Sequence, residues 1–258
     1  MSVPGGVQEL GPFTSGVGLK NAVLAVSLGH HLPVGSALAD AALGSGARQV
    51  VVQHGLLTAF SPPASRTAHL MAWSDADADF WLSGRTDVTA EVIGSQLLWE
   101  AACTPAPASA PTHDDLPLTY LGQLHGAELP RRDMARSTGA FCRATGATYR
   151  PHPSEKDKLS RAQHAIWRRQ GMTIDDGAVP LASLNAPVVS AFSTGVLEAA
   201  AKGIPAWVHY DNPPAWLTEF WQRYRMAQFG GEPTPAPTLP EREPAALLAE
   251  RITAMLEE

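Results

Sequence analysis

Short apolar runs alternate with helix-like segments along this sequence, and this alternation constrains the fold more than any other feature. The runs at 22–26 (Ala-Val-Leu-Ala-Val) and 50–52 (Val-Val-Val) are too short for helices and are almost free of polar residues. Such runs are typical of strands buried on both faces of a parallel sheet. Alanine-rich segments between them end at glycine, as helices do. The alternation therefore predicts parallel sheets with crossover helices.

A Pro-rich stretch divides the chain into two such arrays. Residues 103–112 carry three prolines among small residues, which predicts an extended linker. We expect an N-terminal domain over 1–102, a linker over 103–116 and a C-terminal domain over 117–258, which includes a last helix beyond the prolines of 233–240. The expected strands are 22–26, 50–52, 70–73, 88–93, 118–121, 147–150, 172–174, 188–190 and 206–210. The expected helices are 35–43, 76–82, 131–145, 156–170, 180–184 and 194–202. The fold class is α/β, with two Rossmann-like parallel-sheet domains.

Composition narrows the function classes. A hydrophobic share of 45% excludes wholesale disorder, and a net charge of −6 argues against nucleic acid as the main partner. The sequence holds no run of 18 uncharged apolar residues and no signal-peptide pattern at its start, so we expect a cytoplasmic protein. Two cysteines, Cys103 and Cys142, are too few for a disulfide framework or a four-cysteine zinc site.

The sharpest candidate site follows the expected strand 188–190. Ser193 or Thr194 would cap the next helix, so that hydroxyls and the backbone amides around Gly195 face the strand end, an arrangement that binds phosphate. Glu198 lies about one turn further and is placed to accept ribose hydroxyls. The alternative is an ordinary helix cap with a solvated first-turn glutamate.

A second cluster is Arg150-Pro151-His152-Pro153. The two prolines restrain the histidine at a strand end, where His152 can donate to a phosphate oxygen with support from Arg150. A Pro-rich turn with an exposed histidine is the alternative.

A third cluster, Gln53-His54-Gly55, places a histidine directly after a buried strand. His54 is suited to act as general base for an acceptor hydroxyl, because the ordinary pKa of histidine is near neutrality. His30 and His31 end the preceding strand and, with Gln53, are candidates for the acceptor side. Adjacent residues of an extended segment point opposite ways, so His30 and His31 do not form a metal pair, and we expect no metal site. All of these histidines can also be structural.

Weaker patterns complete the set. Gly122-Gln123-Leu124-His125-Gly126 is a glycine loop without a dinucleotide or P-loop fingerprint, and we add Gly122 and His125 to the phosphate-binding candidates. Asp175-Asp176-Gly177 favours a turn over a metal-binding carboxylate pair. Aromatic residues recur at helical spacing and predict packing rather than a stacking platform. These are Trp216, Phe220, Trp221 and Tyr224.

In their order, these clusters resemble the GT-B glycosyltransferases. The segment from Ser193 to Pro205 resembles the nucleotide-binding helix of that family, and this likeness implies diphosphate contacts for Ser193 and Thr194 and a ribose contact for Glu198. Gln53-His54-Gly55 followed by Arg150-Pro151-His152-Pro153 is similar to the CDP-glycerol glycerophosphotransferase and polysialyltransferase-like branch. There the first histidine is the base and the His-Pro element contacts the donor phosphate. Gln53 stands where that branch usually has tryptophan, and the N-terminal domain is abbreviated.

The resemblance implies a transferase that moves a sugar or polyol phosphate from a nucleotide-activated donor to a glycan or polyol hydroxyl, in cell-envelope glycopolymer synthesis. It implies metal-independent chemistry with no resident cofactor and at most peripheral contact with the inner face of the membrane. A nucleotide-sugar epimerase or hydrolase, and a non-catalytic nucleotide-sugar sensor, remain as alternatives.

Overall fold

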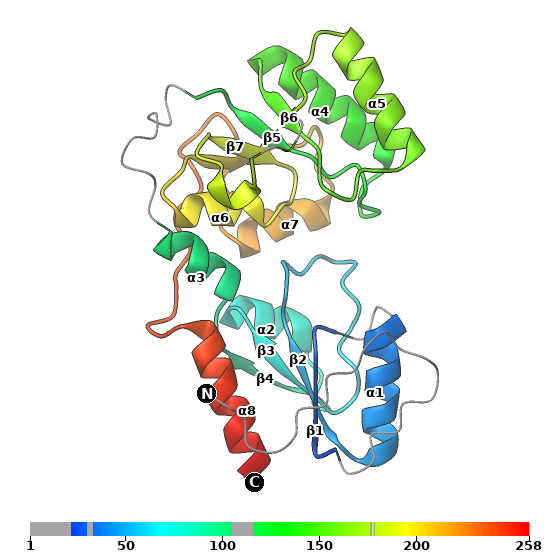
Figure 1. The fold of residues 1–258 in the computed structure, drawn as a ribbon, viewed down its shortest axis with the longest axis vertical. Helices are drawn as coiled ribbons and strands as arrows, with labels where there is room; N and C mark the ends of the chain where they lie inside the picture. The colour runs from blue at the N-terminus through cyan, green and yellow to red at the C-terminus, as the bar shows by residue number, and fades with distance from the viewer. Residues whose placement is uncertain (1–21, 30–32, 105–115, 176, 178, 258) are drawn as a thin grey trace. The chain divides into compact units, whose positions relative to one another are not determined.

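The computed structural model describes residues 22–29, 33–104, 116–175, 177 and 179–257. These residues form an α/β structure with two four-stranded parallel sheets (Figure 1). The chain divides into two compact units, each containing one sheet. The first unit comprises residues up to 57, 61–95 and 242–258, and the second comprises 58–60 and 96–241.

The first sheet has the order β1-β2-β3-β4, with β1 at Leu24–Ser27, β2 at Arg48–Val52, β3 at Ala68–Ala72 and β4 at Thr89–Val92. Parallel neighbours require crossovers, and α1 (Pro33–Ser45) and α2 (Asp75–Leu82) supply two of them. Residues 53–67 connect β2 to β3 without a helix. Alternate residues of the strands face opposite layers: Val51 and Leu70 pack with Trp81 of α2.

The C-terminal helix α8 (Pro244–Glu257) packs with the first unit. Its residues Leu248 and Met255 lie against Val50 and Met71, on the face of the sheet opposite to α2. The Arg251 guanidinium also pairs with Glu91 of β4 at 2.6 Å. The sequence order predicts instead that this helix belongs to the C-terminal domain. The structure differs because an apolar helix face is stabilised wherever an open sheet face accepts it, and proximity in sequence does not decide this.

The second sheet has the order β6-β5-β7-β8, with β5 at Thr119–Leu121, β6 at Thr148–Arg150, β7 at Val188–Ser190 and β8 at Ala206–Val208. Beyond β6, residues around Ile174 continue the sheet only as an isolated parallel bridge to Tyr149, where a full strand was expected. Figure 1 shows α4 (Arg131–Thr145) and α5 (Lys158–Arg169) on one face of this sheet. The other face carries α6 (Gly195–Ala201) and α7 (Ala215–Arg223).

Large aromatic side chains fill the core of the second unit. Tyr120 and Tyr149 stack beside each other on neighbouring strands, and Trp167 of α5 packs edge-on against Tyr149. The α7 residues Phe220 and Trp221 are buried, which confirms the packing role expected for that aromatic run.

Two short elements lie outside the expected pattern. The helix α3 (Gln96–Cys103) was not predicted, and it packs against α6 as part of the second unit. The expected helix 180–184 is a single 3-10 turn, Leu181–Ser183. Within the described residues, no helix is long and apolar enough to cross a membrane.

Candidate functional site

The candidate site lies at the carboxyl ends of the second sheet. The chain leaves β5 for β6 on one side, and β7 and β8 lie on the other, so the winding direction reverses between β5 and β7. Open parallel sheets bind ligands at this reversal, because the loops that leave the two strands there diverge to opposite faces. The loops after β5 and β7 carry His125, Ser193 and Thr194, and the loop after β6 carries His152.

Gln123 ties the loops after β5 and β7 together. Its Oε1 accepts a hydrogen bond from the backbone N–H of Phe192 at 3.0 Å and lies 2.9 Å from the hydroxyl of Ser190. The same hydroxyl is 2.9 Å from the carbonyl oxygen of Leu121. The side-chain amide of Gln123 therefore fixes the separation between the loops that follow β5 and β7.

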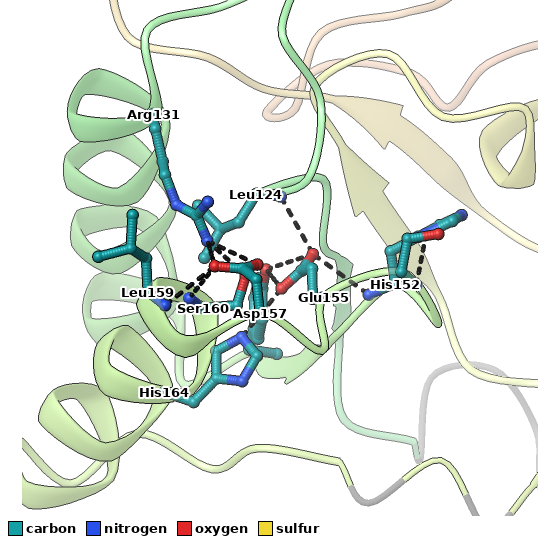
Figure 2. Close-up of polar contacts among 10 residues, drawn as sticks. Leu124, Arg131, His152, Glu155, Asp157, Leu159, Ser160 and His164 are labelled. Atoms are coloured by element: carbon teal, nitrogen blue, oxygen red, sulfur yellow. Dashed lines mark hydrogen bonds and ion pairs between the residues drawn. The ribbon is translucent and has the colours of Figure 1, made fainter.

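Glu155 is the centre of the polar network that shapes the loops (Figure 2). Its buried carboxylate accepts hydrogen bonds from the Tyr149 hydroxyl at 2.8 Å and from the backbone N–H groups of Leu124 at 3.0 Å and His152 at 3.2 Å. The Nε2 atom of His164, on α5, lies 2.9 Å from the carboxylate. A buried carboxylate is costly unless its lone pairs are all engaged. Glu155 meets that condition by fixing the loops after β5 and β6 at once.

Gly122 has no space for a side chain. A Cβ atom at this position would lie 2.3 Å from the Tyr149 hydroxyl oxygen and 2.7 Å from Oε1 of Glu155. Its N–H donates to the carbonyl of Arg150 at 2.7 Å. Gly122, predicted to bind phosphate, therefore allows the loop to pass over the Tyr149–Glu155 pair, and its amide is engaged within the sheet.

His125 and His152 form a stacked pair at the rim of the site. Their ring centroids are 3.8 Å apart with an interplanar angle of 17°. The backbone N–H of Ser154 donates to Nδ1 of His152 at 3.1 Å, so the neutral ring carries its proton on Nε2. Partial desolvation, and then the neighbouring His125, lower the pKa of His152, whereas Glu155 opposes the shift. Figure 2 shows the His152 ring directed away from Glu155, with its backbone facing the carboxylate.

Arg150 is paired with Asp175. Its guanidinium contacts the Asp175 carboxylate at 2.8 Å and donates to the carbonyl of Val179. Asp175 also accepts from the backbone N–H of Gly177 at 2.9 Å, and Gly177 has a positive φ of 78°. This is the turn expected at 175–177, of which Asp176 lies outside the described residues. The structure thus places Arg150 beneath the His-Pro loop as a brace between β6 and this turn.

Ser193 contacts the backbone at the start of α6, whose N-cap residue is Thr194. The Ser193 hydroxyl oxygen accepts from the backbone N–H of Gly195 at 3.1 Å, whereas Thr194 makes no capping bond. Gly195 is buried, and a Cβ there would lie 2.6 Å from Leu121. Glu198 is half-buried, and burial raises the pKa of its carboxyl, with Lys202 opposing the shift.

The first unit holds the other candidate histidine beside a small pocket. The pocket has a volume of about 160 Å³, and His54 is an exposed residue in its lining. Gln53 is buried instead: its amide donates to the carbonyl of Gly55 at 2.9 Å and accepts from the N–H of Trp73 at 2.8 Å. His30 and His31 lie outside the described residues. The remaining lining is mostly apolar: Leu28, Gly29, Val51, Leu56, Leu57, Ser61, Pro62, Ala64 and Trp81.

Sequence reasoning missed Glu155 and His164. Glu155 stands two residues before the cap of α5, where a glutamate is usually solvated, and His164 is nine positions further along the chain. The available signal was the helical period, which places Ser160, His164 and Trp167 on one face of α5. That face is buried, and a histidine on it needs a polar partner.

Comparison with protein-family models and with curated proteins gives no match. Among solved structures, the chain is similar to the pneumococcal O-GlcNAc transferase GtfA in complex with UDP and GlcNAc, with 12% sequence identity and a TM-score of 0.47. The match covers 90% of this chain and 49% of that chain, so this chain spans about half the length of that transferase. Among the described residues, no group of three or more His, Cys, Asp or Glu side chains is arranged to hold a metal ion.

Proposed function

We propose that this chain binds a nucleotide-activated donor at the carboxyl edge of the second sheet and transfers a sugar or polyol phosphate to a hydroxyl acceptor. The observation that carries the proposal is the His125–His152 pair at the rim of the site, where the Ser154 N–H donates to Nδ1 of His152 and leaves Nε2–H as the donor. A diphosphate fits this rim, because its oxygens accept hydrogen bonds and both histidine rings lie where they can contact the same diphosphate group.

The remaining groups of the rim have complementary roles in the proposal. The hydroxyls of Ser193 and Thr194 follow β7 and would contact diphosphate oxygens. The carboxylate of Glu198 would accept the ribose hydroxyls. As the bond between the transferred group and the nucleotide breaks, its electron pair leaves with the nucleotide. Donors fixed before the reaction stabilise that developing charge without reorganising.

His54 is the proposed general base. An acceptor hydroxyl is a weak nucleophile until its proton is removed, and a histidine with an ordinary pKa near neutrality can take that proton as the new bond forms. The mostly apolar pocket beside His54 would hold the acceptor, a glycan or polyol, through its carbon skeleton.

The proposal is tested by ligand-induced stabilisation. Melting temperature is measured with CDP, UDP, GDP and CMP, and a ligand at 100 times its dissociation constant adds about 2.7 kcal/mol to the stability. We expect a nucleoside diphosphate to stabilise the chain, and Glu198→Ala to weaken its binding by about 1–3 kcal/mol in calorimetry. Glu219→Ala, an exposed change on α7, is the matched control.

Three results would contradict this function. If none of the four nucleotides binds, the rim is not a nucleotide site. If a nucleotide-sugar binds and releases free nucleotide diphosphate without an acceptor, the chain is a hydrolase. Binding without turnover over a panel of donors and acceptors would indicate a sensor.

A further inference from the structure

Positive charge is concentrated in one segment of this acidic chain. Residues 131–169, from α4 to the end of α5, hold ten of the 19 Lys and Arg residues but three of the 25 Asp and Glu residues. All three acidic groups are engaged locally: Glu155 is buried, and Asp157 pairs with Arg131 at 3.1 Å. Asp133 pairs with Arg136 at 2.9 Å. The segment therefore presents excess positive charge to solvent.

The outer face of α5 carries most of this excess. Its inner face is the buried set Ser160, His164 and Trp167. All the cations around the outer face are exposed, and within the described part of the chain none of them forms an ion pair. These cations are Lys156, Lys158, Arg161, Arg168 and Arg169.

Two large apolar side chains lie on one side of this outer face, where Lys158 and Arg169 are the nearest cations around the helix, whereas Arg161 and Arg168 lie on its other side. Leu159 is 67% exposed and Ile166 is 45% exposed. They are seven residues apart, so they lie on the same side of the helix, about two turns from each other. Figure 2 shows the Leu159 side chain directed away from Glu155. Lone exposed leucines are ordinary, but an apolar pair beside exposed cations that form no ion pair is typical of a docking surface.

We propose that the outer face of α5 docks on an anionic lipid surface. A helix that lies in a membrane interface buries aliphatic side chains at the headgroup boundary while lysine and arginine reach the lipid phosphates. Leu159 and Ile166 supply the first component, and Lys158 and Arg169, the cations on the same side of α5, supply the second. The surface lacks the aromatic side chains on which bases stack, so a lipid occupant fits better than a nucleic acid. This inference does not depend on the nucleotide-binding proposal.

Cosedimentation of the full chain with vesicles tests this surface. The vesicles are phosphatidylcholine alone, or equal parts of phosphatidylcholine and phosphatidylglycerol. We expect binding to the mixed vesicles only, weakened by salt. Since each cation near an anionic surface contributes about fivefold to binding, Lys158→Gln/Arg169→Gln should lower the affinity roughly 25-fold. Leu159→Ser/Ile166→Ser should also weaken binding, with no change of charge.

The matched control is Arg66→Gln/Arg225→Gln, which removes the same charge from exposed positions outside α5. It should bind the mixed vesicles nearly as wild type does. Equal losses in the two charge variants would show a general charge effect and overturn the proposal. Equal binding to both vesicles, no binding to either, or binding to a polyuridylate RNA without binding to vesicles would overturn it as well. Because all six substituted residues are exposed, melting temperatures should stay near wild type and confirm that each variant is folded.

Discussion

The imidazole rings of His125 and His152 lie parallel at 3.8 Å although the two residues follow different strands. Stacking at this distance requires that the loops after β5 and β6 be held in register to within a fraction of an ångström. Glu155 provides this register, because its carboxylate accepts the backbone N–H of Leu124 from one loop and that of His152 from the other.

Replacement of Glu155 tests this role. Glu155→Gln keeps the shape but turns an –NH₂ group toward N–H donors, and we expect the free energy of unfolding to fall by about 1–3 kcal/mol. Glu155→Ala leaves several buried donors without a partner and should cost more than the glutamine change. Urea denaturation measures both. Glu219→Gln, on the exposed side of α7, should change stability by less than about 0.5 kcal/mol, and a similar loss there would contradict the assignment.

A side chain at Gly122 should disturb the same hydrogen-bond network by displacing the Tyr149 hydroxyl. The Cβ of Gly122→Ala would overlap the Tyr149 hydroxyl, which is held by Glu155 and cannot swing away without breaking a buried hydrogen bond. We expect a loss of about 1–3 kcal/mol in urea denaturation. Gly44→Ala in α1 is the control, because nothing lies within 4 Å of its Cβ and alanine favours a helix. If the two variants were equally stable, the close approach at Gly122 would be refuted.

The sequence predicted the central strands β2, β5 and β7 well because most of their residues are buried. Val50, Val51 and Val189 are buried within sheets that are covered on both faces, and a short apolar run in the sequence indicates such burial directly. The helix Arg131–Thr145 was also predicted with its observed bounds, because it follows Pro130 and ends at Gly146, whose φ is 73°.

Long-range packing could not be read in this way. The helix α8 packs against an open face of the first sheet, which is far away in the sequence. The local pattern of Leu248 and Met255 indicates an apolar helix face but not the sheet that this face contacts. Likewise, Gln53 and Glu155 are polar residues whose buried roles arise from loops brought together by the fold. The sequence alone gives candidates for such roles. The contacts in the structure are needed to distinguish a residue that holds a loop in place from one that binds a ligand.

Histidine titration should make stability pH-dependent. In the folded protein, burial lowers the pKa of His69, His152 and His209 below the ordinary value of 6.5. Below that value the unfolded chain binds more protons at these positions than the folded chain does. The free energy of unfolding is therefore retained in full above pH 6.5 and falls as the pH drops through it.

Urea midpoints at about pH 7.5 and about pH 5.5 measure this effect in a range where carboxyl groups of ordinary pKa scarcely titrate. The triple variant His69→Gln/His152→Gln/His209→Gln should lose less stability between the two pH values than wild type. An identical loss in both proteins would place the pH dependence elsewhere.

The general-base role of His54 makes the sharpest kinetic prediction. Without a base, the acceptor hydroxyl must attack while it still carries its proton, so His54→Ala should lower turnover by roughly 100- to 10,000-fold. The affinity for the donor nucleotide should stay nearly constant, because the nucleotide contacts are assigned to the second sheet. A structural role predicts the reverse pattern: a lower melting temperature with little specific effect on turnover.

Gln53→Ala is the matched comparison, since this neighbour is buried and its amide joins the loops after β2 and β3. It should reduce stability more than His54→Ala does. Melting temperature, donor affinity and rate, measured on one preparation of each variant, separate the two roles, and a stable His54→Ala protein with near wild-type turnover would exclude His54 as the base.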